Sequence, residues 1–330
     1  MKIGYFGDGP WAHQALDQIV DKPGLRVVCI VARHKNPDPV LRERANELEV
    51  PFHAPEDVNA EAFLDQLKKY SPDINVSMSY NQILRKQAID LAPEGFINCH
   101  AGALPFYRGR NILNWALING ENRFGVTVHY VDTKIDTGAI IAQRFEVITP
   151  SDTYKTLLEK APQLCAEALI EALSKIRNGS VAPVDQDSIH PVGFYCSRRR
   201  EGDEWIDWSW PTKRIHNFVR ALTPPGPGAR TKVKGSSIVV TASEKIQQAP
   251  AYIDRPGTVV GRNEEGIIVK TGDTTIHVSE IADWNGGISN RRTPSFPIST
   301  MLTSKPDIDQ LQKRVAHLEE RIAKLEKEQS

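Results

Sequence analysis

The sequence predicts an α/β protein with a doubly wound, mostly parallel sheet, followed by a small β domain and a coiled-coil helix. Three observations carry this prediction. Through the first half of the chain, short apolar segments alternate with amphipathic ones, which is typical of strands and helices in a parallel sheet. Short apolar runs between Gly and Asn turns follow, as in small antiparallel barrels. The C-terminal segment repeats apolar residues in heptads.

The first half contains the segments expected to form a Rossmann-like sheet with helices on both faces. The almost unbroken apolar run LRVVCIVA is typical of a strand covered on both sides. The expected strands are 2–6, 25–32, 73–79, 95–100, 125–131 and 139–148. The expected helices are 10–20, 41–48, 60–70, 82–92 and 152–177, the third capped by Asn59 and the last kinked at Pro162. Ligands of such sheets sit beyond the carboxyl ends of the strands, and His100 follows one of those ends.

A polar connector, 178–188, precedes a region with a different pattern. Tryptophans and an amphipathic helix come first, and short apolar segments separated by turns follow. The expected strands are 235–242, 257–263, 266–272 and 275–281. They predict a small, mostly β domain that is barrel-like and of the OB type. The expected domains are 1–185, 186–300 and 301–330, the last being the coiled-coil helix.

The heptad repeat lies close to the C-terminus. Its core positions are Ile308, Leu311, Val315, Leu318, Ile322 and Leu325. β-Branched residues at each a position and Leu at each d position favour a parallel two-stranded coil. In that register, Arg314 and Arg321 face Glu319 and Glu326 of a partner helix. This pattern predicts a homodimer, and the alternative is an amphipathic helix packed on its own domain.

Composition limits the class of protein. The 330 residues are enough for two ordinary domains, and 40% are apolar. Lys plus Arg and Asp plus Glu are both 41, which argues against a protein built mainly to coat nucleic acid. The sequence has no run of about 18 apolar residues, so no membrane span is predicted. The N-terminus lacks a signal-peptide pattern. The 4 scattered cysteines are typical of free thiols, so we expect a cytoplasmic location.

The first strand-to-helix turn has a glycine pattern that resembles a dinucleotide fingerprint. Gly7, Gly9 and Ala12 stand in the right spacing, although a lone match of this kind is weak. In NAD-binding folds, the next strand ends in an Asp or Glu that holds the ribose diol. Here the next expected strand is followed by the basic run 33–35, so this turn would suit only an NADP-like ligand. A tight turn near some other ligand is the preferred interpretation.

The segment NCHAGALPFYRGRN holds the first candidate site residues. Its Cys-His pair suggests a thiol nucleophile, but neighbours on a strand point to opposite sides of a sheet, so Cys99 is expected to be a buried structural thiol. Asn98 and His100, two residues apart, project to the same side. A metal site formed by His100, His129 and Asp136 is an alternative, although these residues lack the close spacing of familiar metal ligands.

General-base acyl transfer is the third interpretation of these residues. It needs a base that titrates near neutrality, a group that orients the base, and a donor for the developing oxyanion. His100, Asp136 and Asn98 can supply these roles in that order. The loop 132–138 would have to bring Asp136 beside His100.

These segments resemble the folate-dependent formyltransferases. The shared pattern is Asn-x-His, Leu-Pro-x-Tyr-Arg-Gly, Gly-Val-Thr-x-His and a loop ending in Asp-Thr-Gly, and the resemblance covers roughly residues 1–285. It implies transfer of the formyl group of 10-formyltetrahydrofolate to an amine, without a metal. The catalytic residues of the family fall on Asn98, His100 and Asp136. By the same resemblance, the folate would bind at Ile83, Leu84, Asp132 and Ile135.

The tripeptide after His100 suggests one branch of this family. Ala101, Gly102 and Ala103 resemble the branch that formylates amino sugars attached to nucleotides, as in the synthesis of surface polysaccharides such as lipopolysaccharide O-antigen. The acceptor would then be a nucleotide-linked deoxy amino sugar. Its phosphates and base would be held by Tyr107, Arg108, Arg110 and Arg198.

Two other functions remain open. The first is a methionyl-tRNA formyltransferase, although the neutral total charge, the connector without basic residues and the predicted coil argue against it. The second is a non-catalytic dimeric ligand-binding protein on the same fold, against which the complete set of Asn98, His100 and Asp136 argues. The expected partners are therefore folate, a sugar nucleotide and a second copy of the chain, and neither nucleic acid nor a membrane is expected.

Overall fold

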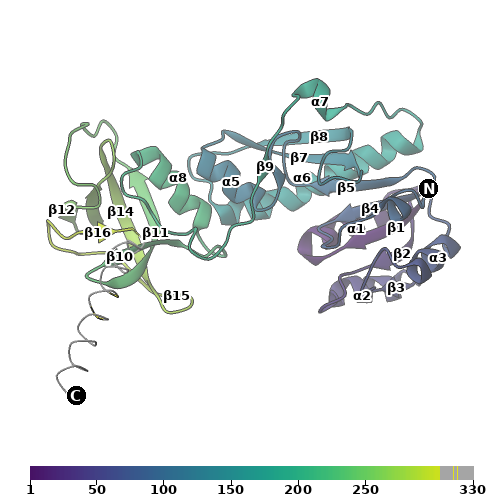
Figure 1. Cartoon of the computed structure of the whole chain (residues 1–330), viewed down its shortest axis with the longest axis horizontal. Helices are drawn as coiled ribbons and strands as arrows, with labels where there is room; N and C mark the ends of the chain where they lie inside the picture. The colour runs from purple at the N-terminus through teal and green to yellow at the C-terminus, as the bar shows by residue number, and fades with distance from the viewer. Residues whose placement is uncertain (305–314, 316–317, 319–330) are drawn as a thin grey trace, which may run out of the picture. The chain divides into compact units, whose positions relative to one another are not determined.

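The computed structural model describes residues 1–304, 315 and 318. The chain divides into two compact units, Met1–Arg199 and Arg200–Ser330, and Figure 1 labels many of their helices and strands. The predicted coiled coil lies outside the described residues except for two of its heptad positions. The coil therefore stays a prediction, as does the division into 1–185, 186–300 and 301–330. No helix in the described part of the chain is long and apolar enough to cross a membrane.

The first unit is built on a 7-stranded sheet with the order β3-β2-β1-β4-β5-β7-β8. The pairs from β3 to β5 are parallel, whereas β7 runs antiparallel to β5 and β8 antiparallel to β7. This confirms the predicted mostly parallel, doubly wound sheet. Strands β1 to β3 are added towards one edge of the sheet, and the strands from β4 onward are added towards the other edge. A crevice is expected beyond the carboxyl ends of β1 and β4, where this direction changes. The strands are β1 (Lys2–Gly7), β2 (Arg26–Val31), β3 (Phe52–His53), β4 (Ile74–Met78), β5 (Phe96–His100), β7 (Arg123–Tyr130) and β8 (Ile140–Val147).

Side chains alternate between the two faces of each strand, so the apolar strands of this sheet present side chains on both faces. Helices cover both faces. On β1, the Tyr5 hydroxyl donates to the Ala12 carbonyl of α1, whereas Phe6 clusters with Phe63 and Leu67 of α3 on the other face. α1 packs against α6. The helices are α1 (Gly9–Val20), α2 (Pro39–Glu47), α3 (Glu61–Lys69), α4 (Lys86–Ile89), α5 (Ile112–Asn119), α6 (Tyr154–Arg177) and α7 (Gln186–Ile189).

Two local expectations about helices are wrong. The segment 82–92 contains only the short helix α4, which follows a loop. Asn59 does not cap α3, whose N-cap position is Ala60. Instead, the Asn59 amide donates to the Ile83 carbonyl and accepts from the Arg85 N–H. The missing first part of the helix and the missing cap have the same cause. The Asn59 side chain binds the backbone of Ile83 and Arg85 instead of capping α3, and it holds residues 82–85 as a loop. Pro162 lies inside α6, which continues beyond it.

Residues 200–304 of the second unit form a curled antiparallel sheet packed against the helix α8 (Thr212–Leu222). The order of the sheet is β12-β13-β14-β11-β10-β16, and β15 also pairs with β14. The helix α8 packs against β11. A bridge between Thr258 and Met301 joins segments next to the two end strands, which agrees with the predicted barrel-like form. The strands are β10 (Ala229–Val233), β11 (Ser236–Lys245), β12 (Val259–Asn263), β13 (Gly266–Lys270), β14 (Thr275–Trp284), β15 (Ile288–Arg292) and β16 (Leu302–Thr303).

Candidate functional site

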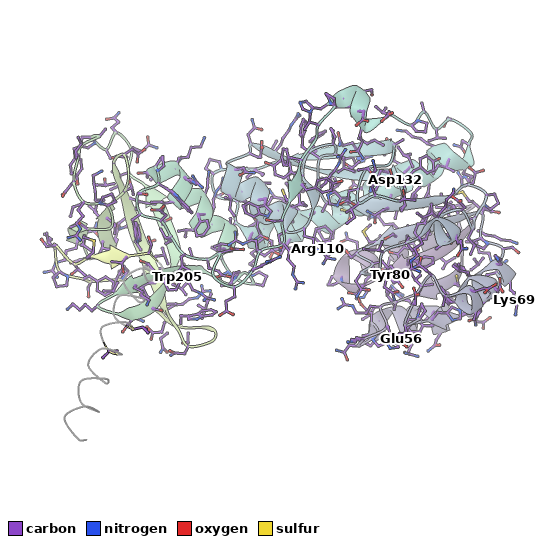
Figure 2. All side chains as sticks on the ribbon, viewed as in Figure 1. Glu56, Lys69, Tyr80, Arg110, Asp132 and Trp205 are labelled. Carbon is purple, nitrogen blue, oxygen red and sulfur yellow. The ribbon has the colours of Figure 1, made fainter. Side chains whose placement is uncertain are left out.

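A cavity of about 790 Å³ opens beyond the carboxyl ends of β4 and β5 in the first unit. Its lining comes from segments that are far apart in the sequence, among them the loops after β4 and β7 and residues of α1, α5 and α6. Figure 2 labels three of the lining residues: Tyr80 after β4, Arg110 after the short strand β6 (Arg108–Gly109), and Asp132 after β7. The predicted residues on its lining are Ile83, Leu84, Asn98, His100, Arg110, Asp132, Ile135 and Asp136.

The loop after β7 brings Asp136 into the cavity. Asp132 begins the loop, and its carboxylate accepts from the Lys134 N–H and the Thr137 hydroxyl, which closes a compact turn. Asp136 has a φ of 55°, in the left-handed region that non-glycine residues rarely adopt. Gly138 follows where an added Cβ would lie 1.9 Å from the Tyr130 carbonyl oxygen, so only glycine fits there. The backbone of this loop is therefore closely constrained.

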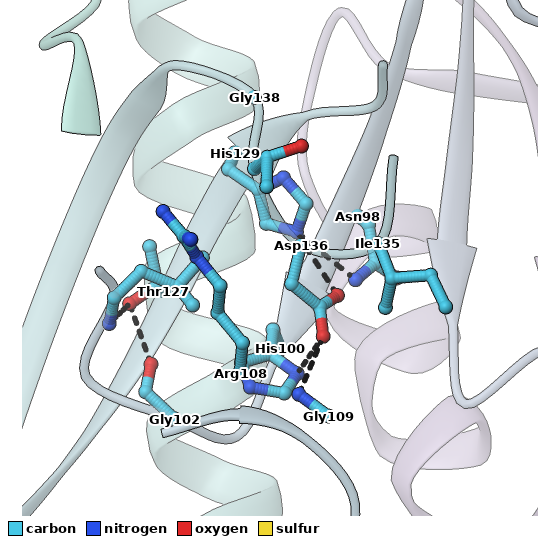
Figure 3. Close-up of polar contacts among 12 residues, drawn as sticks. Asn98, His100, Gly102, Arg108, Gly109, Thr127, His129, Ile135, Asp136 and Gly138 are labelled. Carbon is cyan, nitrogen blue, oxygen red and sulfur yellow. Dashed lines mark hydrogen bonds and ion pairs between the residues drawn. The ribbon is translucent and has the colours of Figure 1, made fainter. Parts of the chain in front are cut away.

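The Asp136 carboxylate lies between two histidines, as Figure 3 shows. Its Oδ2 is 3.6 Å from His100 Nδ1 and accepts a 2.9 Å hydrogen bond from the Gly109 N–H. Its Oδ1 is 3.7 Å from His129 Nε2. The structure therefore brings Asp136 beside His100, as the sequence analysis required.

One tautomer of neutral His100 fits its surroundings. Its Nε2 is 2.7 Å from the Tyr107 carbonyl oxygen, which can only accept, so Nε2 carries the hydrogen. The Nδ1 atom is then unprotonated and faces Asp136. When Nδ1 takes up a proton, the imidazolium gains both the Tyr107 carbonyl and the Asp136 carboxylate as partners. This arrangement suits a general base.

His129 fixes the orientation of Asn98. The His129 Nδ1 lies 2.7 Å from the Tyr130 carbonyl and donates to it, which leaves Nε2 of the neutral ring as an acceptor. The Asn98 Nδ2 is 3.2 Å from that Nε2, so the Asn98 amide must present its nitrogen there. Burial lowers the pKa of His129 to about 4, with Asp136 opposing the shift and His100 adding to it. The second N–H of Asn98 remains for a ligand oxygen in the cavity.

The geometry favours neither a thiol nucleophile at Cys99 nor a dinucleotide site at the first turn. The Cys99 thiol points away from the two histidines and donates to the Cys165 carbonyl in α6. At the first turn, Arg33 pairs with Asp8, and Asp38 accepts from the Gly9 N–H. The groups that a dinucleotide would need are therefore engaged within the protein. Among residues 1–304, 315 and 318, no group of three or more His, Cys, Asp or Glu side chains is arranged to hold a metal.

The residues predicted to hold folate lie on two loops. Ile83 is 71% exposed, whereas Leu84 packs against the apolar cluster between β1 and α3. Gln82 and Asn59 fasten the first loop, because the Gln82 amide bonds the backbone of Val58 and Pro55 and Asn59 bonds that of Ile83. The Tyr80 hydroxyl on the same loop is buried without a hydrogen-bond partner among the described residues.

The residues predicted to hold the acceptor are in different surroundings. Arg110 is exposed on the cavity, and Arg198 is exposed but does not line it. The Tyr107 hydroxyl is engaged, since it donates to Glu121 at 2.5 Å. Arg108 is buried and donates from Nε and from one terminal nitrogen to Gln186 Oε1. Of these four side chains, the structure brings only Arg110 to the cavity.

Sequence reasoning missed three residues that shape this site: His129 as the partner of Asn98, Asn59 as the anchor of the loop 80–85, and Gln186 as the partner of Arg108. The pairing of Asn98 with His129 depends on the register of β5 and β7, which places them directly opposite each other. The hydrogen bonds of Gln186 and of Asn59 join segments that are far apart in the sequence. No periodicity in the sequence indicates that these segments lie together. The histidine in Gly-Val-Thr-x-His was the only available signal.

The doubly wound sheet, with a polar cluster in the cavity beyond the carboxyl ends of β4 and β5, is the arrangement of an α/β enzyme. Residues 1–173 match the formyl transferase family, and residues 199–289 match the C-terminal domain of formyl transferases. The chain belongs to this family and is an N-formyltransferase.

Two curated relatives are about 30% identical to this chain. The methionyl-tRNA formyltransferase of Pelobacter propionicus is 31% identical over 287 residues, covering 84% of this chain and 88% of the relative. The methionyl-tRNA formyltransferase of Trichlorobacter lovleyi is 30% identical over 288 residues, covering 85% and 89%.

Solved structures share the fold at lower identity. An N-formyltransferase from Helicobacter canadensis, in complex with folinic acid and dTDP-3-aminofucose, is 19% identical with a TM-score of 0.63, covering 84% of this chain and 99% of that one. HypX from Aquifex aeolicus, in complex with tetrahydrofolic acid, is 19% identical with a TM-score of 0.55, covering 86% and 44%.

The preferred acceptor of the sequence analysis, a sugar nucleotide, is therefore wrong. The relatives that are about 30% identical over most of the chain are named methionyl-tRNA formyltransferases, whereas the sugar enzyme at 19% identity supports the fold alone. The tripeptide after His100 misled the prediction for a structural reason. A Cβ added at Gly102 would lie 2.4 Å from the Tyr107 carbonyl oxygen and 2.5 Å from His100 Nε2. Packing around His100 therefore accounts for this glycine without reference to the acceptor.

Proposed function

We propose that this enzyme transfers the formyl group of 10-formyltetrahydrofolate to the α-amino group of methionyl initiator tRNA. The similarity to methionyl-tRNA formyltransferases over 84–85% of the chain carries this proposal. The neutral total charge argued against a tRNA enzyme, but a total says nothing about how charges are distributed over a surface. A cytoplasmic location, expected from the free cysteines, is part of the proposal.

The geometry of the site supports a mechanism by general-base catalysis. The neutral amine of the acceptor attacks the formyl carbon, and the carbonyl oxygen becomes an oxyanion. The free N–H of Asn98 donates to that oxyanion. His100 Nδ1 takes the proton lost by the amine, and Asp136 stabilises the imidazolium. Collapse of the tetrahedral intermediate breaks the bond to N10 of the folate, which receives the proton from His100 as it leaves.

Two features support folate as the formyl donor. The related structures contain folinic acid, 5-N-formyl-THF or tetrahydrofolic acid. In this chain, the loop after β4 places Tyr80, Ile83 and Leu84 on the cavity lining, where the two apolar side chains can pack against a pterin ring. The backbone of the loop that begins at Asp132 forms the facing wall, with Ile135 on its exposed side.

The cavity also offers groups suited to an aminoacyl adenosine. Trp11 at the start of α1 and Tyr154 and Leu158 at the start of α6 contribute an apolar lining, because α1 and α6 pack together. Such a lining suits an unbranched apolar side chain such as that of methionine. The Tyr195 ring lines the cavity and is 55% exposed, so it can stack on a base, and Arg110 can contact a phosphate.

The direct test is formylation of defined acceptors by the purified full chain. With 10-formyltetrahydrofolate, we expect formylation of methionyl initiator tRNA and at least 100-fold loss of rate in His100→Asn, in keeping with loss of a general base. The exposed change Lys69→Ala on α3 serves as the control variant. Formylation of an amino-sugar nucleotide, with methionyl-tRNA left unmodified, would refute the proposal.

We also propose that the heptad repeat pairs two copies of the chain. The β-branched and Leu pattern at its core positions supports a two-stranded coil. Light scattering of a chain truncated before Pro306 should show a monomer where the full chain shows a dimer. An unchanged dimer mass would contradict this role of the coil.

A further inference from the structure

Gln186 binds the catalytic loop through its side-chain amide. The residue is 1% exposed and starts α7, within the connector that follows α6. Its Nε2 donates to the Asp136 carbonyl at 3.0 Å and to the Gly138 carbonyl at 2.8 Å. Its Oε1 accepts from Arg108 Nε at 3.1 Å and from a terminal nitrogen of Arg108 at 2.7 Å. The amide thus uses both of its donor hydrogens and both of its acceptor lone pairs.

The chemistry of these partners requires an amide at position 186. Backbone carbonyls only accept hydrogen bonds and a guanidinium only donates them, so the orientation of the Gln186 amide is unambiguous. A carboxylate would face the two carbonyls without a hydrogen to donate. An apolar side chain would leave both carbonyls and the buried Arg108 without this partner, and unpaired buried polar groups are costly.

The contacts form a closed ring around Asp136. Gln186 holds the main chain of Asp136, which has the uncommon φ of 55°. The Gly109 N–H holds the carboxylate of Asp136 at 2.9 Å. Arg108, directly before Gly109 in the chain, closes the ring through its side chain to Gln186. Asp136 is therefore fixed at its backbone by one end of this network and at its carboxylate by the other.

We propose that Gln186 is a positioning residue for Asp136, with Arg108 as its partner. The inference rests on the proposed function, in which Asp136 stabilises protonated His100. Asp136 Oδ2 is 3.6 Å from His100 Nδ1, which is already longer than a hydrogen bond, so a further displacement would weaken their electrostatic contact. Displacement of a catalytic group by about 1 Å can cost on the order of 100-fold in rate. Loss of the Gln186 amide should act on the chemical step more than on substrate binding.

The test compares Gln186→Met with Gln143→Met in the full chain. Gln143 is a matched control, because its amide also donates to a backbone carbonyl, that of Leu104, and does not touch the Asp136 loop. We expect Gln186→Met to lower kcat by about 100-fold, with KM for folate and for methionyl-tRNA within about threefold of wild type. Gln143→Met should keep kcat within about threefold of wild type, by the same argument.

A double substitution separates positioning from general destabilisation. In the Asp136→Asn background, Gln186→Met should cause little further loss of kcat, because the group it positions has already been altered. Independent, multiplying losses would overturn the proposal, as would a folded Gln186→Met variant with wild-type kcat. If Gln186→Met does not fold, Gln186→Glu provides the same comparison, since it keeps the size and the attraction to Arg108. A wild-type chain that does not formylate methionyl-tRNA would instead refute the proposed function.

Discussion

Asn98 and His129 lie directly opposite each other on the antiparallel strands β5 and β7, and the Asn98 amide nitrogen is 3.2 Å from His129 Nε2. Because the other ring nitrogen of His129 donates to the Tyr130 carbonyl, this Nε2 can only accept. One N–H of Asn98 is therefore committed to His129, and the direction of the second is set by the planar amide. His129 thus acts on the proposed reaction through Asn98.

Substitution of His129 should weaken the proposed oxyanion donor. In His129→Leu, the Asn98 amide loses its partner and can rotate, so we expect kcat to fall by about 10- to 100-fold, which corresponds to one hydrogen bond of about 1–3 kcal/mol. His129→Gln can present a carbonyl oxygen to the same amide and should recover part of the rate. Steady-state kinetics with KM determined for both substrates measure this. Equal rates for His129→Leu and wild type would show that Asn98 needs no such partner.

The stability of the first unit should depend on pH through His129. Burial lowers the pKa of His129 from 6.5 to about 4 in the folded protein. Above pH 6.5, the residue is neutral in both the folded and the unfolded chain. As the pH falls from 6.5 towards 4, the unfolded chain takes up a proton that the folded chain excludes, so the free energy of unfolding decreases. The total loss is on the order of 3 kcal/mol.

Urea unfolding at several pH values between 7 and 4 would measure this dependence. His129→Gln is the matched variant, because it keeps an acceptor for Asn98 but has no group that titrates in this range. The decrease in the free energy of unfolding with falling pH should be smaller in the variant than in wild type. Parallel curves for the two proteins would contradict the assignment of His129 as a buried neutral residue.

The parts of the site that could be predicted depend on local periodicity. Asn98 and His100 share a side because side chains on a strand alternate, and the structure places both on the cavity. The approach of Asp136 could be anticipated from the family pattern and is seen in the contact with His100. The catalytic roles of these three residues remain predictions, which the variants proposed here would test.

The parts that could not be predicted depend on long-range contacts. Gln186 and Asn59 each bind backbone groups of loops that are separated from them by 24 to 50 residues, and no sequence period reveals such contacts. The helix expected over 82–92 had suitable residues, but the side chain of Asn59 holds its first part as a loop. Tertiary hydrogen bonds therefore overrode local helix propensity at the wall of the cavity.

Removal of the Asn98 amide should slow the reaction without preventing folding. Asn98→Ala loses the N–H that faces the cavity, and loss of one oxyanion donor typically costs about 100- to 1,000-fold in kcat. The KM values for both substrates should change little, because the developing charge exists only in the transition state. The thermal midpoint of the variant provides the control for folding. A loss below about tenfold would show that another group stabilises the oxyanion.

Asn59 should affect folate binding in particular. Its amide bonds both the Ile83 carbonyl and the Arg85 N–H, so Asn59→Ala releases the loop that carries Ile83 and Leu84 on the cavity wall. Loss of these two hydrogen bonds, at about 1 kcal/mol each, should raise KM for 10-formyltetrahydrofolate by roughly 10- to 30-fold. The KM for methionyl-tRNA and the kcat at saturating folate should stay close to wild type, since the loop holds none of the three proposed catalytic residues. Lys68→Ala, on the exposed surface of the neighbouring helix α3, is the matched control. An equal rise in both KM values would show that the loop supports the cavity as a whole and is not specific to the folate side.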